Sequence, residues 1–214
     1  MDYVREIIKR PGCRIIRLES GNKLTVPYAL FKQKPLAAGK PLDADIYMRA
    51  LAPLEEKAAL EQSARMLALR DRASAEIATK LTGQGYSGQT VSAVLERLTK
   101  AGLVDDRRFA QDYTARAGKK KGSRQIRFEL ARKGLSGLLI EDVMRERDEG
   151  KEFTAAIRLA QKQLSKPCGD RRSLYRRAFA ALARRGFAPD VVKKALETVM
   201  SQRNDAIECP EDGE

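Results

Sequence analysis

The sequence contains no histidine, no tryptophan and only three cysteines, and these shortages exclude several classes of chemistry. Without histidine there can be no Ser-His-Asp or Cys-His triad and no histidine metal ligand. The cysteines, Cys13, Cys168 and Cys209, stand too far apart for a zinc motif, and their odd number argues against a disulfide framework. No glycine-rich phosphate loop or dinucleotide fingerprint is present. We therefore expect no enzymatic activity, no cofactor and no bound metal.

Long apolar runs and aromatic residues are also scarce. The longest apolar runs are far too short for a membrane span and there is no signal-peptide pattern, so we expect a cytoplasmic protein without membrane contact. Aromatic residues make up only 6% of the chain. A group of them has the spacing of helix core positions, which predicts packing rather than base stacking. This group is Phe109, Tyr113, Phe128, Phe153, Tyr175 and Phe179.

What the sequence does contain is an internal repeat anchored on Gly85, Gly134 and Gly186. A leucine precedes each glycine by four residues, at Leu81, Leu130 and Leu182, and further apolar residues follow at six, nine and ten residues. The last turn before Gly134 and Gly186 is basic, which is typical of a helix that ends in a left-handed glycine cap. Each copy therefore predicts a helix, a glycine turn and a second helix.

Flanking signals extend each copy to three helices. We expect Ser74 and Ser123 to be the N-caps of the helices that precede the turns, and Pro189 to lie in the first turn of the last helix. A leading helix comes before each of these pairs, as in the apolar series Leu60, Ala64 and Leu67. We predict an all-α fold of three tandem three-helix repeats, at residues 55–104, 105–150 and 151–203, that stack into an elongated array.

The two ends of the chain have a different character. Short β-branched runs at residues 14–18 and 24–26 flank a glycine-asparagine turn and predict a small β-hairpin. We expect residues 1–54 to form an appendage that ends in a proline-rich connector containing Pro35, Pro41 and Pro53. Residues 204–214 carry five carboxylates and predict a solvated acidic tail.

The charge is strongly positive and unevenly distributed. The net charge is +13, and the segment 151–203 alone has 13 basic against 4 acidic residues. Such a concentration indicates a surface that faces a polyanion, most often nucleic acid. The alternative is a basic face that is simply solvated.

Three stretches resemble the bacterial RecX family, regulatory proteins of the RecA recombinase. They are Ala68-Leu-Arg-Asp-Arg-Ala-Ser74 with Glu76, Ile77 and Leu81, Gly102-Leu-Val-Asp-Asp-Arg-Arg-Phe-Ala110 with Tyr113, and Lys121-Gly122 with Ile126, Glu129, Leu130, Lys133 and Gly134. The resemblance implies a protein of three three-helix repeats that binds the RecA filament on single-stranded DNA. It also implies inhibition of ATP hydrolysis, strand exchange and coprotease activity, with roles in DNA repair, recombination and the SOS response.

The candidate contacts with DNA or recombinase are all basic. They are Arg70, Arg72, Lys119, Lys120, Lys121, Arg124, Arg127, Arg132, Lys133, Arg171, Arg172, Arg176, Arg177, Arg184 and Arg185. The cluster at 119–124 ends one helix and opens the next, so we expect exposed backbone amides there to meet a phosphate or carboxylate. The arginines of 171–185 are expected to line one helix face. For Arg70 and Arg72 the alternative is contact with the last carbonyls of the preceding helix.

The remaining motif residues are interpreted as structural. Asp105 and Asp106 start a helix, and two carboxylates at such a position are caps far more often than metal ligands. The structural set is Ser74, Leu81, Gly85, Asp105, Asp106, Phe109, Leu130, Gly134, Leu182 and Gly186.

Three functions compete at this point. The first is a monomeric inhibitor that contacts both the recombinase filament and DNA phosphates without reading base sequence, either at filament ends or along the groove. The second is a helix-turn-helix transcriptional regulator, which needs base-reading side chains that the helices after the glycines largely lack. The third is a phosphoryl-transfer or nuclease enzyme, which lacks a metal-binding constellation. We favour the first.

Overall fold

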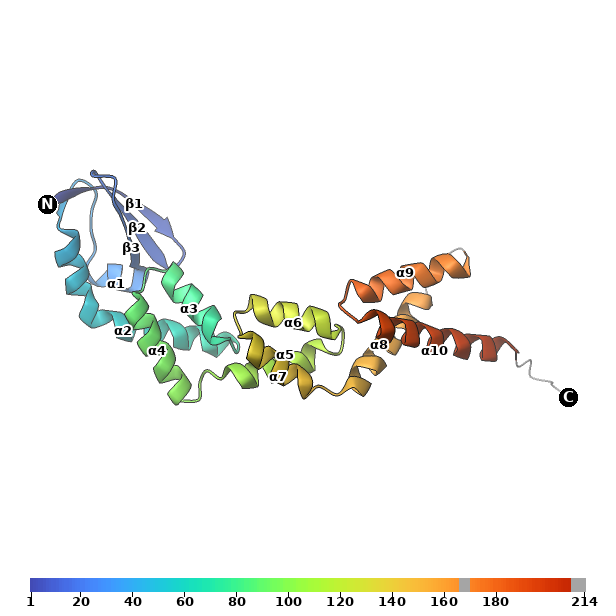
Figure 1. Cartoon of the computed structure of the whole chain (residues 1–214). Coiled ribbons are helices and arrows are strands. Elements are labelled where there is room, and N and C mark those ends of the chain that lie inside the picture. Colours follow the sequence, from blue (N-terminus) through green and yellow to red (C-terminus); the bar gives the residue numbers. More distant parts are fainter. Residues whose placement is uncertain (166–169, 209–214) are drawn as a thin grey trace. The chain divides into compact units, whose positions relative to one another are not determined.

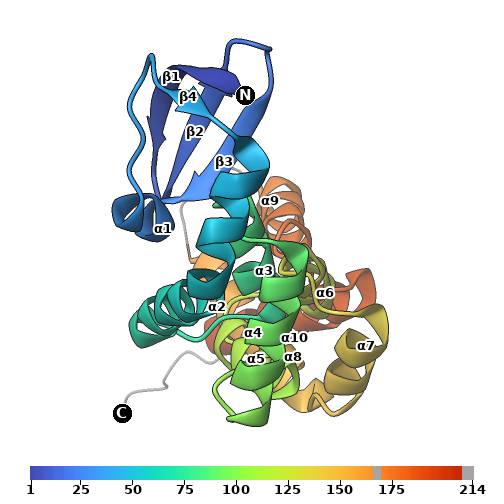
Figure 2. The same ribbon diagram turned by 90° about the vertical axis from the view of Figure 1, so that its left-hand side faces the viewer.

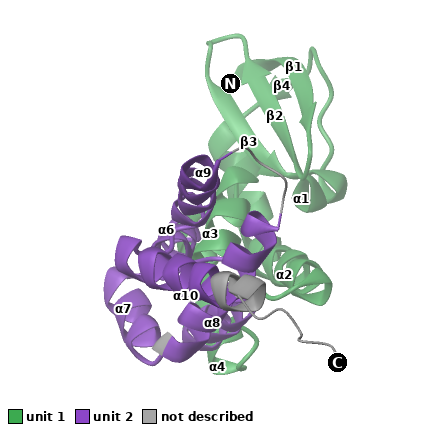
Figure 3. Ribbon diagram, turned by 90° about the vertical axis from the view of Figure 1, so that its right-hand side faces the viewer, with its two compact units in different colours: residues 1–106 green, residues 107–214 purple. Residues whose placement is uncertain are grey.

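The structure, a computed structural model, describes residues 1–165 and 170–208 and divides into two compact units, Met1–Asp106 and Arg107–Glu214 (Figures 1 and 3). The first unit contains β1 (Asp2–Arg10), β2 (Cys13–Leu18), β3 (Lys23–Pro27), α1 (Tyr28–Gln33), β4 (Pro41–Leu42), α2 (Ala44–Leu69), α3 (Ser74–Gly83) and α4 (Gly88–Lys100). Helix α5 (Asp106–Ala117) starts at Asp106, the last residue of the first unit. The second unit continues with α6 (Ser123–Arg132), α7 (Gly137–Arg145), α8 (Glu149–Leu164), α9 (Arg171–Ala183) and α10 (Pro189–Glu208). Cys168, Cys209 and the acidic residues from 211 onward lie outside the described residues.

The first unit begins with a four-stranded antiparallel sheet in the order β3-β2-β1-β4 (Figure 2). Strands β2 and β3 are the predicted hairpin, which is confirmed, with Ile16 paired to Leu24. Strand β1 has no counterpart in the prediction, because charged residues and a register shift between Val4 and Glu6 break its apolar alternation. One face of the sheet contributes Val4, Ile16 and other side chains to the core.

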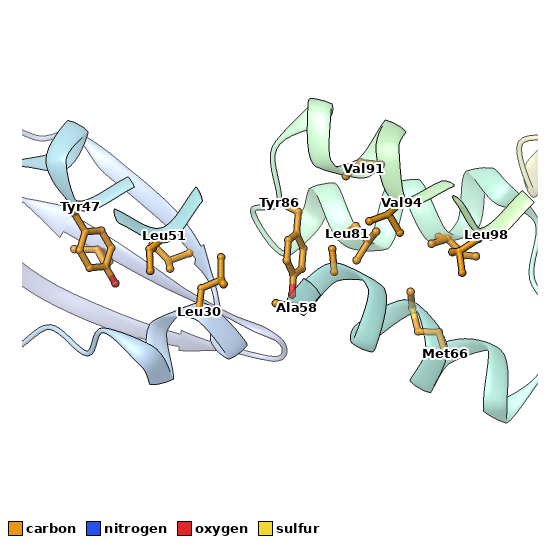
Figure 4. Close-up of a cluster of buried hydrophobic side chains, with 14 of the residues drawn as sticks. Leu30, Tyr47, Leu51, Ala58, Met66, Leu81, Tyr86, Val91, Val94 and Leu98 are labelled. Atoms are coloured by element: carbon orange, nitrogen blue, oxygen red, sulfur yellow. The ribbon is translucent and has the colours of Figure 1, made fainter. Parts of the chain in front are cut away.

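Helix α2 overturns the predicted connector. It runs without interruption from Ala44 to Leu69 and includes Pro53, so no proline-rich linker separates the sheet from the repeats. Its first half packs Tyr47 and Leu51 beside α1, and its second half packs Met66 beside α3 and α4 (Figure 4). One hydrophobic core therefore joins residues 1–54 to the first repeat. The hydroxyl of Tyr47 also donates to the carbonyl of Lys34 at 2.8 Å.

The inward face of α2 also differs from the prediction. Ser63 and Met66 are buried, whereas Ala64 is exposed. Leu60 and Leu67 of the predicted series do pack against the core, so the fully buried face is centred only about one residue away from the predicted one. The cause is the composition of this helix, in which alanines occur on all sides and give no distinct apolar stripe.

The glycine turns are confirmed in all three copies. Gly85, Gly134 and Gly186 have φ angles of 92°, 84° and 80°, the left-handed region that glycine tolerates best. In each turn the N–H after the glycine donates to the carbonyl of the repeat's leucine, at 3.2–3.4 Å, which is the longer bond of a Schellman cap. Those three leucines have no exposed surface. The same backbone geometry thus ends α3, α6 and α9.

The second unit contains the second and third repeats. Helices α8, α9 and α10 bury a cluster that includes Phe187 and Leu196, and Phe153, Tyr175 and Phe179 pack against it as predicted. Helix α10 begins at Pro189, also as predicted, and its backbone continues to Glu208, beyond the expected repeat end at 203. Phe128 on α6 is the exception among the aromatics, because it is 57% exposed. The prediction that it packs in the core is wrong.

Among the described residues, no helix combines the length and the apolar character needed to span a bilayer.

Candidate nucleic-acid and protein interface

The N-terminus of α6 is enclosed by other parts of the second unit. The N–H of Gly122 donates to the carbonyl of Arg185 at 2.9 Å, and the N–H of Arg124 donates to the carbonyl of Gly186 at 3.1 Å. Between them, the N–H of Ser123 donates to the carboxylate of Glu152 at 2.8 Å. The predicted cradle of exposed amides is therefore wrong, because protein groups already accept these hydrogen bonds.

Both expected N-cap serines occupy the first helical position instead. The N-caps of α3 and α6 are Ala73 and Gly122, and the serines that follow each bind a carboxylate. Ser74 donates through its N–H and hydroxyl to Asp106 at 2.8 and 2.5 Å, and Ser123 donates in the same way to Glu152. An acidic residue from the start of the next repeat thus replaces the missing cap, at the positive end of the helix. Asp106 is therefore a cap, but it caps α3 and not, as predicted, the helix that it starts.

A buried ion pair supports this arrangement in the second unit. The guanidinium of Arg147 donates to Glu152 at 3.1 Å and to the Ser123 hydroxyl at 2.8 Å, and its side chain is only 9% exposed. Burial lowers the pKa of Arg147, and the charge of Glu152 opposes that effect. No local pattern in the sequence indicates this triad, because its members are up to 29 residues apart. The only available signal is a serine eleven residues before both Gly85 and Gly134.

The backbone contacts at α6 bring two predicted basic clusters together. We define the junction cluster as Arg124, Arg184 and Arg185 with Lys119 and Lys120 of the loop before α6. These side chains are exposed, and no salt bridge within the described part of the chain involves them. Arg158 of α8 donates to the carbonyl of Lys119 and so holds the loop. The backbone hydrogen bonds thus bring exposed cations of the second and third repeats close together in the junction cluster.

Several other predicted contact residues hold the second unit together. Lys121 pairs with Glu129 at 2.6 Å, and Arg127 pairs with Glu141 at 2.9 Å. Lys133 lies over the rings of Phe109 and Tyr113, with Nζ 5.3 and 5.5 Å from their centroids. Arg177 is half-buried and donates to the carbonyl of Gln163 at 3.4 Å.

Four other predicted cations, on α9 and α6, are more exposed to solvent than these residues. Arg171, Arg172 and Arg176 are exposed along α9, and Arg132 is exposed on α6. Arg176 donates only to the neighbouring hydroxyl of Ser173, at 3.4 Å, among the contacts that the structure describes for it. These four side chains can reach a ligand in solvent.

In the first unit, the two motif arginines face the chain itself. Nε of Arg72 donates to the carbonyl of Met66 in the last turn of α2 at 3.4 Å, so the predicted alternative of a carbonyl contact is confirmed for this residue. Arg70 pairs with Glu76 at 3.1 Å. Arg70 thus links the end of α2 to α3, and Arg72 fixes the loop between them to the last turn of α2.

Glu129 is the most strongly perturbed carboxylate of the interface. Partial burial opposes its ionisation, but hydrogen bonds from Gln125, Lys121 and Tyr113 outweigh burial and lower the pKa of Glu129 to about 2. The ionised carboxylate therefore links α6 to α5 and to the loop between them at neutral pH.

Nothing in the described residues gathers three or more candidate metal ligands.

The fold and this surface define a tandem helical-repeat protein with a basic face. Models of the first, second and third three-helix domains of RecX match residues 59–98, 105–144 and 151–196. Regulatory protein RecX from Chlorobium phaeobacteroides is 30% identical over 70% of this chain and 98% of its own length. Regulatory protein RecX from Mycobacterium sp. strain KMS is 37% identical over 69% of this chain and 82% of its own. The chain belongs to the RecX family of regulatory proteins.

Solved structures agree with the fold. A crystal structure of RecX from Lactobacillus salivarius aligns with a TM-score of 0.63 and 18% identity, over 69% of this chain and 97% of that one. A crystal structure of a regulatory protein RecX aligns with a TM-score of 0.58 and 23% identity, over 94% of this chain and all of that one.

Proposed function

We propose that this chain binds the RecA filament on single-stranded DNA and inhibits its ATP hydrolysis, strand exchange and coprotease activity. Membership of a family of regulators supports the regulatory part of the proposal. The junction cluster is the observation that carries the DNA contact. Its cations come from two repeats whose backbones are in contact, and they lack acidic partners in the described structure, so a polyanion can neutralise them.

The contact with DNA is expected to be independent of base sequence. Side chains that read bases project from a helix that enters the major groove. The first turn of α7 is apolar, at Leu138 and Leu139, and the next residues include Glu141, which is already paired with Arg127. Helix α10 opens with a proline and Asp190. These helices offer little for base reading, which argues against the transcriptional alternative.

Steady-state ATP hydrolysis by RecA on single-stranded DNA tests the proposal. We expect added protein to lower the rate in a dose-dependent way. The double variant Arg124→Glu/Arg184→Glu should need about ten times more protein for half inhibition, because it reverses two charges of the junction cluster. Lys57→Glu/Lys80→Glu is the matched control, since both lysines belong to the first unit and the net charge changes equally. Equal weakening by both variants, or no inhibition by the unmodified protein, contradicts the proposal.

A further inference from the structure

An exposed phenyl ring stands out on α6. The inward face of this helix is formed by Ile126 and Leu130, which have no exposed surface. Phe128 lies halfway between them in sequence, so it projects from the opposite side and is 57% exposed. The ring is not needed for the core, yet it presents an aromatic surface to solvent.

Two arginines border this ring on the same helical face. Arg124 and Arg132 stand four residues before and after Phe128, and residues at this spacing are neighbours on a helix surface. The guanidinium carbon of Arg132 lies 5.8 Å from the ring centroid, near the outer limit of a cation–π contact. Among the side chains that the structure describes, neither arginine takes part in a salt bridge. The neighbouring Arg127, by contrast, is held by Glu141.

Arg124, Phe128 and Arg132 form a row along α6. This row is continuous with the junction cluster, because Arg124 belongs to both. An aromatic ring between two available guanidinium groups matches one ligand class well. A single-stranded nucleic acid offers unpaired bases that stack on rings, with a phosphate on either side of each base. A duplex offers phosphates but keeps its bases inside the stack.

We propose that Phe128 is a stacking platform for one base of single-stranded DNA, with Arg124 and Arg132 holding the flanking phosphates. This inference rests on the proposed DNA contact and adds a specific residue and a preference for unpaired strands. The stack tolerates any base, because every base has a π face.

Two other exposed apolar side chains, Tyr28 and Leu138, lack this combination. The ring of Tyr28 is already covered by Arg14, whose guanidinium carbon lies 4.2 Å from the centroid. Leu138 on α7 is 84% exposed, but it has no ring and Asp142 follows it by four residues. Leu138→Ala is therefore the matched control for removing exposed apolar surface from the same repeat.

Two variants of Phe128 test the stack. Phe128→Leu keeps an apolar side chain without the ring, and its affinity for an oligo-dT strand should fall about 5- to 150-fold, the value of one stacked base. Its affinity for an abasic oligonucleotide of the same length should equal that of the unmodified protein, because the phosphate contacts remain. Phe128→Trp places a single tryptophan in a chain that has none, and its fluorescence should be quenched by oligo-dT and not by the abasic strand.

The outcomes separate this inference from the proposed function. If the unmodified protein binds oligo-dT while Phe128→Leu and Leu138→Ala bind it equally well, the DNA contact stands and the stacking inference is wrong. Loss of RecA inhibition by Phe128→Leu with unchanged binding to oligo-dT places the ring against the recombinase and also overturns the inference. If the unmodified protein binds neither strand, the DNA contact of the proposed function fails as well.

Discussion

Leu130 has no exposed surface and occupies the position that Leu81 and Leu182 occupy in the other repeats. We predict that Leu130→Ala lowers the free energy of unfolding by about 2–5 kcal/mol, because it removes buried methyl groups and leaves a cavity. Leu138→Ala, at an exposed position of the same repeat, should change it by less than about 0.5 kcal/mol. Urea denaturation measures both. Equal changes in the free energy of unfolding for the two variants would show that Leu130 is not a core residue.

Glu129 predicts a pH dependence of stability. Its pKa falls from 4.5 to about 2 in the folded state, so the folded protein favours the ionised form. This stabilisation is fully present above pH 4.5 and is lost as the pH falls toward 2. We expect it to be worth about 1–2 kcal/mol after allowance for solvent screening.

Glu129→Gln provides the comparison for that pH dependence. The difference in unfolding free energy between the original protein and the variant should shrink between about pH 5 and about pH 2. Urea titrations at several pH values measure it. A difference that stays constant over this range would show that the charge of Glu129 contributes nothing.

The structural role of a single residue can be predicted from the sequence where local chemistry determines that role. The turn glycines and the leucines before them follow from a cap that is closed within about six residues. The prediction for Phe128 fails because apolar character alone does not give a residue's angle around the helix. Ile126 and Leu130 already fill the inward face, so a residue midway between them must point outward.

At the scale of elements, Gly122 allows a close contact between the second and third repeats. A Cβ at this position would lie closer than 3.0 Å to backbone atoms of Gly186 and Phe187. Gly122→Ala should therefore lower stability by about 1–3 kcal/mol, since neither backbone can yield easily. Gly137→Ala, where a Cβ meets open space, should instead raise stability by about 0.4–1 kcal/mol. Thermal unfolding measures both variants. Stability changes of the same sign in the two variants would contradict the close contact at Gly122.

Helix α9 offers a contrast between adjacent arginines. Arg176→Glu should shallow the log-log salt dependence of single-stranded DNA binding by about 0.7 for each phosphate that the variant no longer neutralises, without changing helical content. Arg177→Glu should instead lower the melting temperature, because this side chain is half-buried and bonds to Gln163. Salt titrations and circular dichroism measure the two effects. Identical behaviour of the two variants would contradict the assigned orientations.

Most helices are predictable because their periodicity, caps and turns agree within each copy. Within the sheet, only the β2–β3 hairpin has a comparable signal in the sequence, two β-branched runs that flank a turn. Strand β4 is two residues long, and β1 is irregular at Val4 and Glu6, so neither has a clear pattern. Pro53 predicts a break, but α2 continues through it. The packing of this helix on both the sheet and the first repeat is a tertiary effect that no local signal reports.

At the scale of the whole molecule, the candidate surface is predictable only in parts. The residue types of the junction cluster follow from charge counting. That these residues lie close together cannot be predicted in this way, because the contact depends on backbone hydrogen bonds between segments that are distant in sequence, such as the one from Gly122 to Arg185. The same hydrogen bonds disprove the predicted amide cradle. Charge identifies candidate cations, whereas only the folded backbone decides which of them are already paired.

The central claim is that this protein recognises the RecA filament and not merely its DNA. The most direct test is steady-state ATP hydrolysis by preformed filaments, titrated with this protein at fixed salt while excess free single-stranded DNA is varied. We predict that inhibition persists under this competition and occurs well below one molecule per recombinase monomer, because a specific regulator must bind the filament more tightly than the bare strand. Inhibition that vanishes once free DNA exceeds the protein's binding capacity, while filaments remain, would contradict the claim.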